Sequence, residues 1–327
     1  MMEESLNIII YMFLRNWSIF SFWFLIEIKC KLRVIIGLDA IIITMEMIKN
    51  KRFDEERALY ALSDTKLESV SFKGPLDGES ALKETSDLEL EKVYFDLRYP
   101  LWHSRNITMN DSVMTVNCRA AVWYSENIKI IESKLLGIKV IRECENIDIS
   151  DSTIVSPELG WKSKNIVIKN SNVESEYAFF ESENITVDRL QFKGKYSFQY
   201  VENGIISNSI FKTKDAFWHA NNLTIKDSVI EGEYLAWYSS NLTFINCKII
   251  GTQPFCYCKN LKLIDCEMID TDLSFEYSEV DAVVKGSILS IKNPKSGKII
   301  ADKIDDIILT NDSKIKSECE IYINNIK

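Results

Sequence analysis

The chain has 327 residues, of which 46% are hydrophobic and 27% charged, a composition typical of folded globular proteins rather than disordered ones. Acidic residues outnumber basic ones, 48 to 39, and the formal net charge of -9 argues against nucleic acid or an anionic membrane surface as the main partner. The eight cysteines include no Cys-x-x-Cys pair and are too sparse for a disulfide-framed secreted domain. We therefore expect reduced thiols and a cytoplasmic location.

Residues 1–46 differ from the rest of the chain because they consist of long apolar runs. A bilayer span of about 20 apolar residues would hold Arg15 near its middle, at a cost of about 2.5–3.5 kcal/mol, and the segment begins with acidic rather than basic residues. Three interpretations stay open: a membrane anchor, an N-terminal cap, and an upstream stretch joined by a wrongly assigned start codon. We favour the third, because Met45 and Met47 stand just before the composition changes. No membrane partner is expected unless the extension is genuine.

After this segment an asparagine recurs at a nearly constant interval. The first step of the series is slightly longer than the rest, and every later step is identical. The positions one, three and eight residues after each asparagine are mostly apolar, and the sixth is usually serine or cysteine. The recurring residues are Asn106, Asn127, Asn146, Asn165, Asn184, Asn203, Asn222, Asn241 and Asn260.

This repeat predicts an all-β solenoid. Apolar residues two apart are typical of a strand, and a fixed period of about 19 residues is typical of stacked coils that share one core. Three strand-like segments per period favour a right-handed parallel β-helix with about twelve coils. A leucine-rich horseshoe would carry a Leu-x-x-Leu-x-Leu signature, which is missing. Asparagine suits the repeat because it tolerates the left-handed turn conformation, and stacked amides can hydrogen-bond between coils.

The ends of the chain depart from the period. Arg52–Tyr60 is polar and alternates poorly, which suggests a short capping helix over the first coil. The expected organisation is an apolar extension outside the fold at 1–46, an N-terminal cap at 47–63, the β-helix at 64–304, and a C-terminal strand or cap at 305–327.

The segments before each asparagine are distinctive. Examples are Cys118-Arg119-Ala120-Ala121-Val122-Trp123-Tyr124-Ser125, Gly232-Glu233-Tyr234-Leu235-Ala236-Trp237-Tyr238-Ser239 and Gly251-Thr252-Gln253-Pro254-Phe255-Cys256-Tyr257-Cys258. Over about residues 47–310 the chain resembles a bacterial family known as domain of unknown function three-seven-three-seven. The resemblance implies a single-stranded right-handed β-helix of the pectin-lyase-like kind. It implies no established reaction, so no catalytic residues carry over.

Two columns stand next to each other in these segments. Five tryptophans lie four residues before an asparagine, and a polar row follows one residue later. Because neighbours on a strand face opposite ways, the tryptophans are expected in the core and the polar row on the surface. The tryptophans are Trp102, Trp123, Trp161, Trp218 and Trp237, and the polar row is His103, Tyr124, Glu143, Lys162, Glu181, Tyr200, His219, Tyr238 and Tyr257.

A rigid face of aromatic and charged side chains suits a carbohydrate, whose apolar ring faces stack on aromatics while its hydroxyls bond to polar groups. The alternative is a solvated surface with no ligand. The residues expected to bind a glycan or another extended polar ligand are Tyr124, Arg142, Tyr177, Tyr196, Tyr200, Asp215, His219 and Tyr238.

Candidate catalytic groups cluster in the middle of this face. Glu143 and Glu181 stand two coils apart, about 9.6 Å by the layer spacing, close to the carboxylate separation of about 6.5–9.5 Å in inverting glycosidases. Glu158 lies nearby, and Lys162 or Arg142 would serve as the base of a polysaccharide lyase. An ion-pair ladder of alternating charge that merely avoids repulsion is the simpler interpretation.

No metal or cofactor site is expected. His103 and His219 share a column but stand six coils apart, so they cannot share one centre. Cys247, Cys256, Cys258 and Cys266 resemble a zinc-binding set, but four thiolates would have to converge at about 2.3 Å from the metal. Cys247 and Cys266 occupy positions that hold serine in other coils, whereas Cys256 and Cys258 lie on another side of the coil. We expect small buried thiols in place of serines.

Two functional hypotheses follow. The first is a glycan-binding protein, or a glycoside hydrolase or polysaccharide lyase if it is an enzyme. The second is a non-catalytic scaffold that assembles end to end or presents its face to a protein partner. The sequence predicts no oligomeric state.

Overall fold

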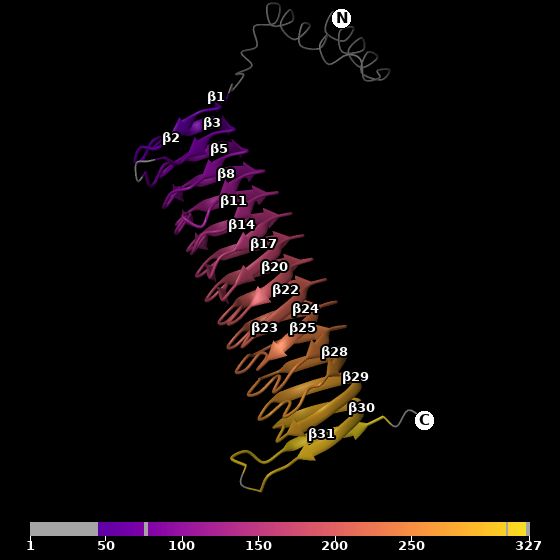
Figure 1. Cartoon of the computed structure of the whole chain (residues 1–327). Helices are drawn as coiled ribbons and strands as arrows, with labels where there is room; N and C mark the ends of the chain where they lie inside the picture. Colours follow the sequence, from indigo (N-terminus) through magenta and orange to yellow (C-terminus); the bar gives the residue numbers. More distant parts are fainter. Residues whose placement is uncertain (1–44, 75–77, 312, 325–327) are drawn as a thin grey trace, which may run out of the picture. The chain divides into compact units, whose positions relative to one another are not determined.

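The computed structural model describes residues 45–74, 78–311 and 313–324, and these residues form an all-β solenoid of parallel strands (Figure 1). None of the described residues forms an α-helix, so this part of the chain holds no helix that could span a membrane. The expectations for the apolar extension at 1–46 fall almost wholly outside the described residues, apart from its last two.

One side of the solenoid is a stack of fifteen parallel strands. Its members are β1 (Glu46–Lys49), β3 (Ser63–Glu68), β5 (Ser86–Glu91), β8 (Arg105–Asn110), β11 (Glu126–Ile131), β14 (Glu145–Ser150), β17 (Lys164–Lys169), β20 (Glu183–Asp188), β22 (Glu202–Ser207), β24 (Asn221–Lys226), β26 (Thr243–Ile245), β28 (Leu261–Ile269), β29 (Glu279–Lys292), β30 (Ser296–Ile308) and β31 (Glu318–Ile323).

In the coils up to β27 (Lys248–Ile250), the chain turns sharply after each strand of the first stack and enters a second side of the solenoid. It comprises β2 (Arg52–Phe53), β4 (Ser71–Phe72), β6 (Tyr94–Phe95), β9 (Val113–Met114), β12 (Lys134–Leu135), β15 (Thr153–Val155), β18 (Asn172–Ser175), β21 (Gln191–Gly194), β23 (Ile210–Lys214), β25 (Val229–Glu233) and β27 (Lys248–Ile250), and it continues in the long strands β28 to β30.

The third side is strand only in part. β7 (Leu101–Trp102), β10 (Val122–Trp123) and β13 (Ile141–Arg142) form a three-stranded sheet, and β16 (Glu158–Leu159) pairs with β19 (Tyr177–Ala178). Later coils complete this side with turns whose inward residues are buried phenylalanines, among them Phe198, Phe217 and Phe255. The predicted three-sided parallel solenoid is confirmed.

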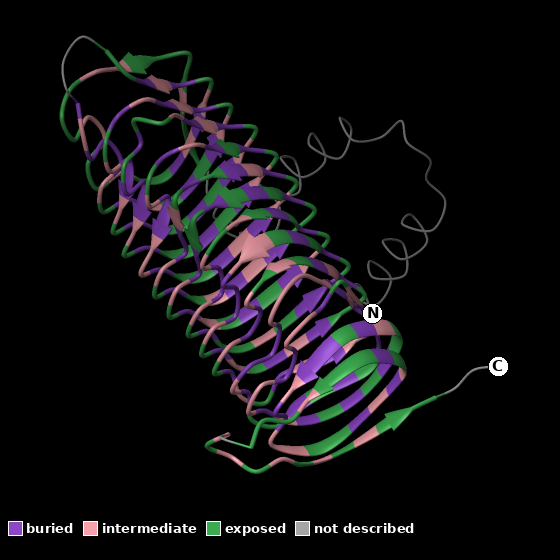
Figure 2. Ribbon diagram, turned by 60° about the horizontal axis from the view of Figure 1, so that its bottom comes forward, coloured by how far each residue is buried: buried purple, intermediate pink, exposed green. Residues whose placement is uncertain are grey.

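The core is a set of apolar columns that run through the stacked coils, with buried and exposed positions alternating along the strands (Figure 2). One column is apolar in all fifteen strands of the first stack, from Ile48 in β1 to Ile321 in β31. Because each coil alone exposes its apolar face, this continuity is what buries the core.

The stack exceeds the expected twelve coils because both ends continue it. The capping helix expected at Arg52–Tyr60 is wrong: Arg52 and Phe53 form β2, which pairs with β4, and turns follow. Phe53 stacks on Phe72 at 5.5 Å between ring centroids, so the segment adds a further coil rather than a lid.

The asparagine column forms the predicted ladder. The Nδ2 group of Asn146 donates to Oδ1 of Asn127 at 2.9 Å, and the Nδ2 group of Asn165 donates to Oδ1 of Asn146 at 2.9 Å. These asparagines also have φ values near +55°, the left-handed region that asparagine tolerates better than other side chains. The two reasons expected from the sequence for the period are both confirmed.

Candidate functional site

The tryptophan column lies on the outside of the solenoid and not in its core. All five tryptophans are partly exposed, and the buried residue is the one before each, such as Leu101 or Phe217. Alternation fails because the residue after the tryptophan is left-handed; His103 and His219 both have φ of 56°. The expectation that the tryptophans point inward was therefore wrong, and the polar row faces solvent beside them.

The tryptophans tie successive coils together. The indole N–H groups of Trp161, Trp218 and Trp237 each donate to the carbonyl oxygen of the residue sixteen positions later, at 2.6–2.8 Å. Gln199 replaces tryptophan in this column and its Nε2 group donates to the equivalent carbonyl, that of Asp215, at 2.9 Å. The column therefore supplies hydrogen-bond donors to an adjacent turn of backbone.

The polar row forms a ladder of stacked rings, which we call the aromatic ladder. Its members are Tyr200, His219, Tyr238, Tyr257 and Tyr277. The ring centroids of successive members lie 4.6, 5.1, 4.6 and 5.6 Å apart, and the first three pairs are within 9° of parallel. A shorter stack, His103 on Tyr124 at 5.1 Å, occupies the same row nearer the N-terminal end.

Stacking leaves the ring edges, not the ring faces, available to a ligand. Both faces of His219 and of Tyr238 are covered by neighbouring rings, although the Tyr238 side chain as a whole remains 45% exposed. A sugar therefore cannot stack on these rings as expected from the sequence. The ladder instead offers a row of phenol and imidazole edges, one per coil, that can donate and accept hydrogen bonds.

The expected catalytic groups fall into two ion-paired sets. The guanidinium of Arg142 lies between the rings of Trp123 and Trp161, 5.6 and 5.1 Å from their centroids. It contacts Glu143 at 3.2 Å and Glu158 at 3.5 Å. Glu158 is also 3.3 Å from Lys139. Arg142 thus takes the place of a tryptophan in its column and binds two of the candidate carboxylates.

Lys162 and Glu181 form the second set, with Nζ and Oε2 3.4 Å apart. Both side chains are about half exposed. These contacts agree with the ion-pair ladder.

The remaining expected ligand residues lie in the parallel column four residues earlier in each coil. Tyr177 and Tyr196 stack with centroids 4.9 Å apart, and burial raises the pKa of Tyr177. Asp215, the next member, is only 7% exposed, so the expectation that it faces solvent was wrong. Burial raises the pKa of the Asp215 carboxyl, and the nearby Lys214 opposes that shift.

Sequence reasoning missed one rung of the ladder. Tyr277 packs against Tyr257 with its ring tilted by 45°, and it stands one position later than the period requires. Three residues after it stands Val280, where the other rungs of the ladder have asparagine. The signal that identifies it is local, because Phe275 is two residues before Tyr277 just as Phe255 is two before Tyr257.

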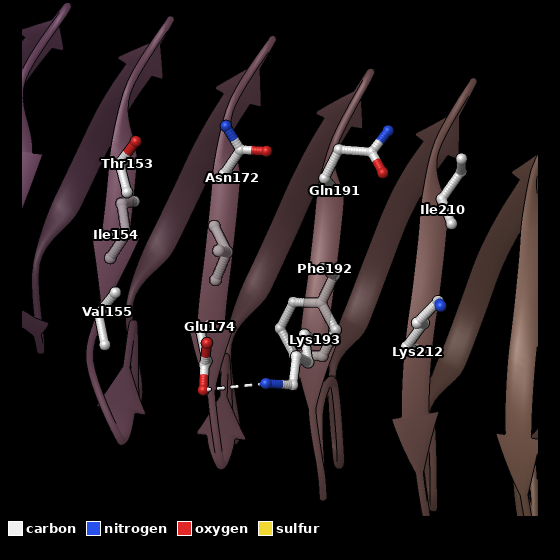
Figure 3. A pocket seen from close by; sticks show the side chains of 11 residues that line it. Thr153, Ile154, Val155, Asn172, Glu174, Gln191, Phe192, Lys193, Ile210 and Lys212 are labelled. Atoms are coloured by element: carbon white, nitrogen blue, oxygen red, sulfur yellow. Dashed lines mark hydrogen bonds and ion pairs between the residues drawn. The ribbon is translucent and has the colours of Figure 1, made fainter.

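A shallow depression of about 300 Å³ lies on the second side, away from the aromatic ladder (Figure 3). The row Thr153, Asn172 and Gln191 borders it on one side, and Glu174 is paired with Lys193 at 3.4 Å on the other. Its floor is the outer surface of β15, β18, β21 and β23, so the depression is a furrow between side-chain rows rather than a cleft.

No group of histidine, cysteine and acidic side chains within the described ranges could hold a metal ion. Cys247 and Cys266 lie buried in the serine positions of their coils, as expected. The thiols of Cys256 and Cys258 are likewise buried, and burial raises the pKa of Cys258 to about 11.

A family model described as "Protein of unknown function (DUF3737)" matches residues 46–322. The search of curated proteins found no match. Three solved structures are similar at low scores. PfbA, a surface adhesin of Streptococcus pneumoniae, is 10% identical with a TM-score of 0.37, covering 85% of this chain and 82% of PfbA. HetL, a pentapeptide repeat protein of Nostoc sp. strain PCC 7120, is 8% identical with a TM-score of 0.23, covering 76% and 95%. The A-module of the mannuronan C-5 epimerase AlgE4 of Azotobacter vinelandii is 13% identical with a TM-score of 0.20, covering 86% and 79%.

Proposed function

The chain belongs to the DUF3737 family of proteins of unknown function, and from this premise we propose that it binds an extended glycan along the aromatic ladder. The observation that carries the proposal is the ladder itself, five rings in consecutive coils with centroids 4.6–5.6 Å apart. A linear polysaccharide that lies along the solenoid axis places about one sugar unit opposite each rung.

Recognition in this proposal is by hydrogen bonds rather than by stacking. The phenol groups of Tyr200 and Tyr238 are half exposed, and the ring of His219 lies between them. A phenol both donates and accepts, as does a neutral imidazole, so a row of such edges suits the hydroxyls of a sugar chain. Because the rings support one another, their edges are already ordered before the ligand binds, which lowers the entropic cost of binding.

The same geometry favours binding over catalysis. Glu143 is paired with Arg142, Glu158 with Arg142 and Lys139, and Glu181 with Lys162. A glycoside hydrolase, whether inverting or retaining, needs one carboxyl that carries a proton and a second that is free to act as base or nucleophile. Paired carboxylates on an open surface suit neither role, so they serve here as an ion-pair ladder beside the binding row.

The test is binding of the full chain to a panel of linear β-linked and α-linked oligosaccharides, measured by calorimetry. The double variant Tyr200→Phe/Tyr238→Phe keeps the ring stack and removes two hydroxyls. We expect it to weaken binding about tenfold, since each hydrogen bond contributes about 0.5–1.5 kcal/mol. Tyr322→Phe, which removes an exposed hydroxyl on β31, is the matched control and should bind as the wild type does. A panel with no binder, or a double variant that binds normally, would contradict the proposal.

A second candidate function is a scaffold that assembles end to end. Within the described residues no strand pairs with the outer edge of β31, and Tyr322 and Ile323 at that end are 48% and 44% exposed. An open strand edge is a template for pairing with another chain. Sedimentation of the full chain over a range of concentrations tests this candidate, and a monomer at every concentration would contradict it.

A further inference from the structure

Cys247 and Cys266 interrupt a column of serines that runs along one inner corner of the solenoid, six residues after each asparagine. The column, which we call the serine column, consists of Ser112, Ser133, Ser152, Ser171, Leu190, Ser209, Ser228, Cys247 and Cys266. Every serine in it is buried, and both cysteines are too. Thiols therefore stand on two consecutive rungs of this column, at its C-terminal end.

The serine side chains have a fixed structural task. The Ser228 hydroxyl donates to the carbonyl oxygen of Lys226 at 2.7 Å and accepts the backbone N–H of Ser209 at 3.1 Å. Each serine thus links its own coil to the preceding one, and the same pair of bonds recurs at Ser133 and Ser152.

The two thiols repeat this geometry with sulfur. The Cys247 thiol contacts the carbonyl oxygen of Ile245 at 3.3 Å, and the Cys266 thiol contacts that of Ile264 at 3.5 Å. The two cysteines stand in aligned positions of adjacent coils, because the backbone N–H of Glu267 donates to the carbonyl oxygen of Cys247 at 2.8 Å. The sulfurs are therefore neighbours across the interface between two coils.

The backbone spacing permits a covalent bond between them. Lys248 pairs with Glu267 in the parallel register, so Cys247 and Cys266 are directly aligned. Strands in a sheet lie about 4.8 Å apart, within the range of about 4.4–6.8 Å between the Cα atoms of a disulfide. The Cβ atoms of a disulfide lie only about 3.8 Å apart, so bond formation would draw the coils together locally. Such strained disulfides are the readily reduced ones.

The pair is also within reach of a small oxidant. Cys247 lines a depression of about 350 Å³, whose rim carries the ion pairs Lys248–Glu267 and Lys285–Asp265. Gly286 lies at its rim, and a Cβ there would meet no atom closer than 3.7 Å. The register shifts between Leu263 and Cys266, which marks a local irregularity in the stack beside the thiols.

We infer that Cys247 and Cys266 form a reversible disulfide when the protein meets a hydroperoxide such as hydrogen peroxide. One thiolate attacks a peroxide oxygen, the O–O bond breaks, and a sulfenic acid and one water result. The neighbouring thiolate then displaces the sulfenic hydroxyl as a second water. The two thiols lose two electrons and two protons in total, and the peroxide is reduced to two waters.

The other described cysteines lack such a partner. Cys144 has Ser125 and Ser163 one rung away in its column, and Cys258 has Ser239 and Ser278. Cys256 and Cys258 belong to one coil and their sulfurs bond to different carbonyls. Cys247 and Cys266 are the pair that stands on consecutive rungs of the serine column.

The test treats the full native chain with hydrogen peroxide, blocks the remaining thiols with an alkylating reagent after unfolding, and maps the peptides by mass spectrometry. We expect one cross-linked peptide that joins Cys247 to Cys266, lighter by two hydrogen atoms, and its loss on treatment with dithiothreitol. Recovery of both thiols alkylated, a different pairing, or sulfinic acid at Cys247 without a cross-link would overturn the inference.

Serine variants make the test independent of folding. Cys247→Ser and Cys266→Ser restore the residue that fills the column elsewhere, so each variant should fold and each should abolish the cross-link. Cys256→Ser is the matched control for a buried thiol outside the column and should leave the cross-link unchanged. A cross-link that persists in Cys266→Ser would show that the partner of Cys247 lies elsewhere and would also overturn the inference.

Discussion

Trp218 and Trp237 lie face to face on the outer surface of the solenoid, with ring centroids 5.3 Å apart and ring planes 4° apart. Each also bonds to the backbone of an adjacent turn, Trp218 to the carbonyl of Tyr234 and Trp237 to that of Gln253. These tryptophans therefore link successive coils from the outside, by ring stacking and by a hydrogen bond to the backbone. We call this pair of contacts the tryptophan clamp.

Loss of one clamp should be measurable. In Trp237→Phe the ring still packs, but the Gln253 carbonyl loses its donor. In Trp102→Phe no such bond is lost, because the buried indole N–H of Trp102 contacts no acceptor among the described residues. A typical hydrogen bond contributes about 0.5–1.5 kcal/mol, and Gln253 is only partly buried, so Trp237→Phe should be the more destabilising by about that amount. Urea denaturation of both variants checks this, and equal losses of stability would contradict it.

The architecture was predictable because the asparagine column has a physical cause that is visible in the sequence. Asn106 to Asn260 mark one left-handed turn per coil, and the apolar positions around them follow strand alternation. The direction of the tryptophans was not predictable by the same rule. His103, Glu143 and other residues of the polar row also adopt left-handed φ values, and their residue types do not predict that conformation.

The asparagine ladder provides the second prediction, at Asn146, which has φ of 57° and bonds to Asn127 and Asn165. Asn146→Gly keeps the backbone conformation and loses both bonds, whereas Asn146→Ala also incurs left-handed strain of about 1–2 kcal/mol. Thermal and urea unfolding should therefore rank the wild type above Asn146→Gly and Asn146→Gly above Asn146→Ala. An alanine variant as stable as the glycine variant would show that the ladder, and not the turn conformation, selects asparagine.

Alanine variants of two glycines should separate the energetic cost of a steric clash from the cost of a left-handed backbone. A Cβ on Gly232 would lie 1.8 Å from the carbonyl oxygen of Thr213, whereas a Cβ on Gly286, where φ is 85°, would make only ordinary van der Waals contacts at 3.7 Å. Gly232→Ala should therefore destabilise the fold by about 3 kcal/mol, the upper end of the usual cost of overpacking, since the preceding coil must move. Gly286→Ala should cost only about 1–2 kcal/mol of left-handed strain. Unfolding by guanidinium measures both, and similar losses would contradict the steric argument.

The residues of the candidate site were predicted with uneven success for a related reason. Tyr200, His219 and Tyr238 were expected on the surface and lie there, because side-chain chemistry and period agree at those positions. The stacking of their faces depends on rung spacing and ring tilt, which a linear sequence does not specify. Burial of Asp215 depends on the neighbouring coils, so the polarity of its side chain wrongly predicted that it would be exposed.

Asp215 gives the last prediction, which concerns pH. Burial raises the pKa of its carboxyl above the ordinary value of 3.8, so the folded protein binds a proton there more tightly than the unfolded chain does. The protonated form therefore favours folding, and this contribution is lost as the pH rises from the unfolded pKa through the higher folded pKa. Asp215→Asn removes the charge and still tolerates the φ of 54°. We expect it to stabilise the fold relative to the wild type at neutral pH and to lose that advantage below about pH 3.

Chemical denaturation of both proteins across this pH range measures the effect. Asp151→Asn is the matched control, because Asp151 is exposed and has a similar φ of 52°. Asp151→Asn therefore measures what the amide substitution alone does to an exposed aspartate in this backbone conformation. If Asp215→Asn were destabilising at neutral pH, the carboxylate would have to be stabilised in the folded state rather than penalised, and burial would not be what governs its titration.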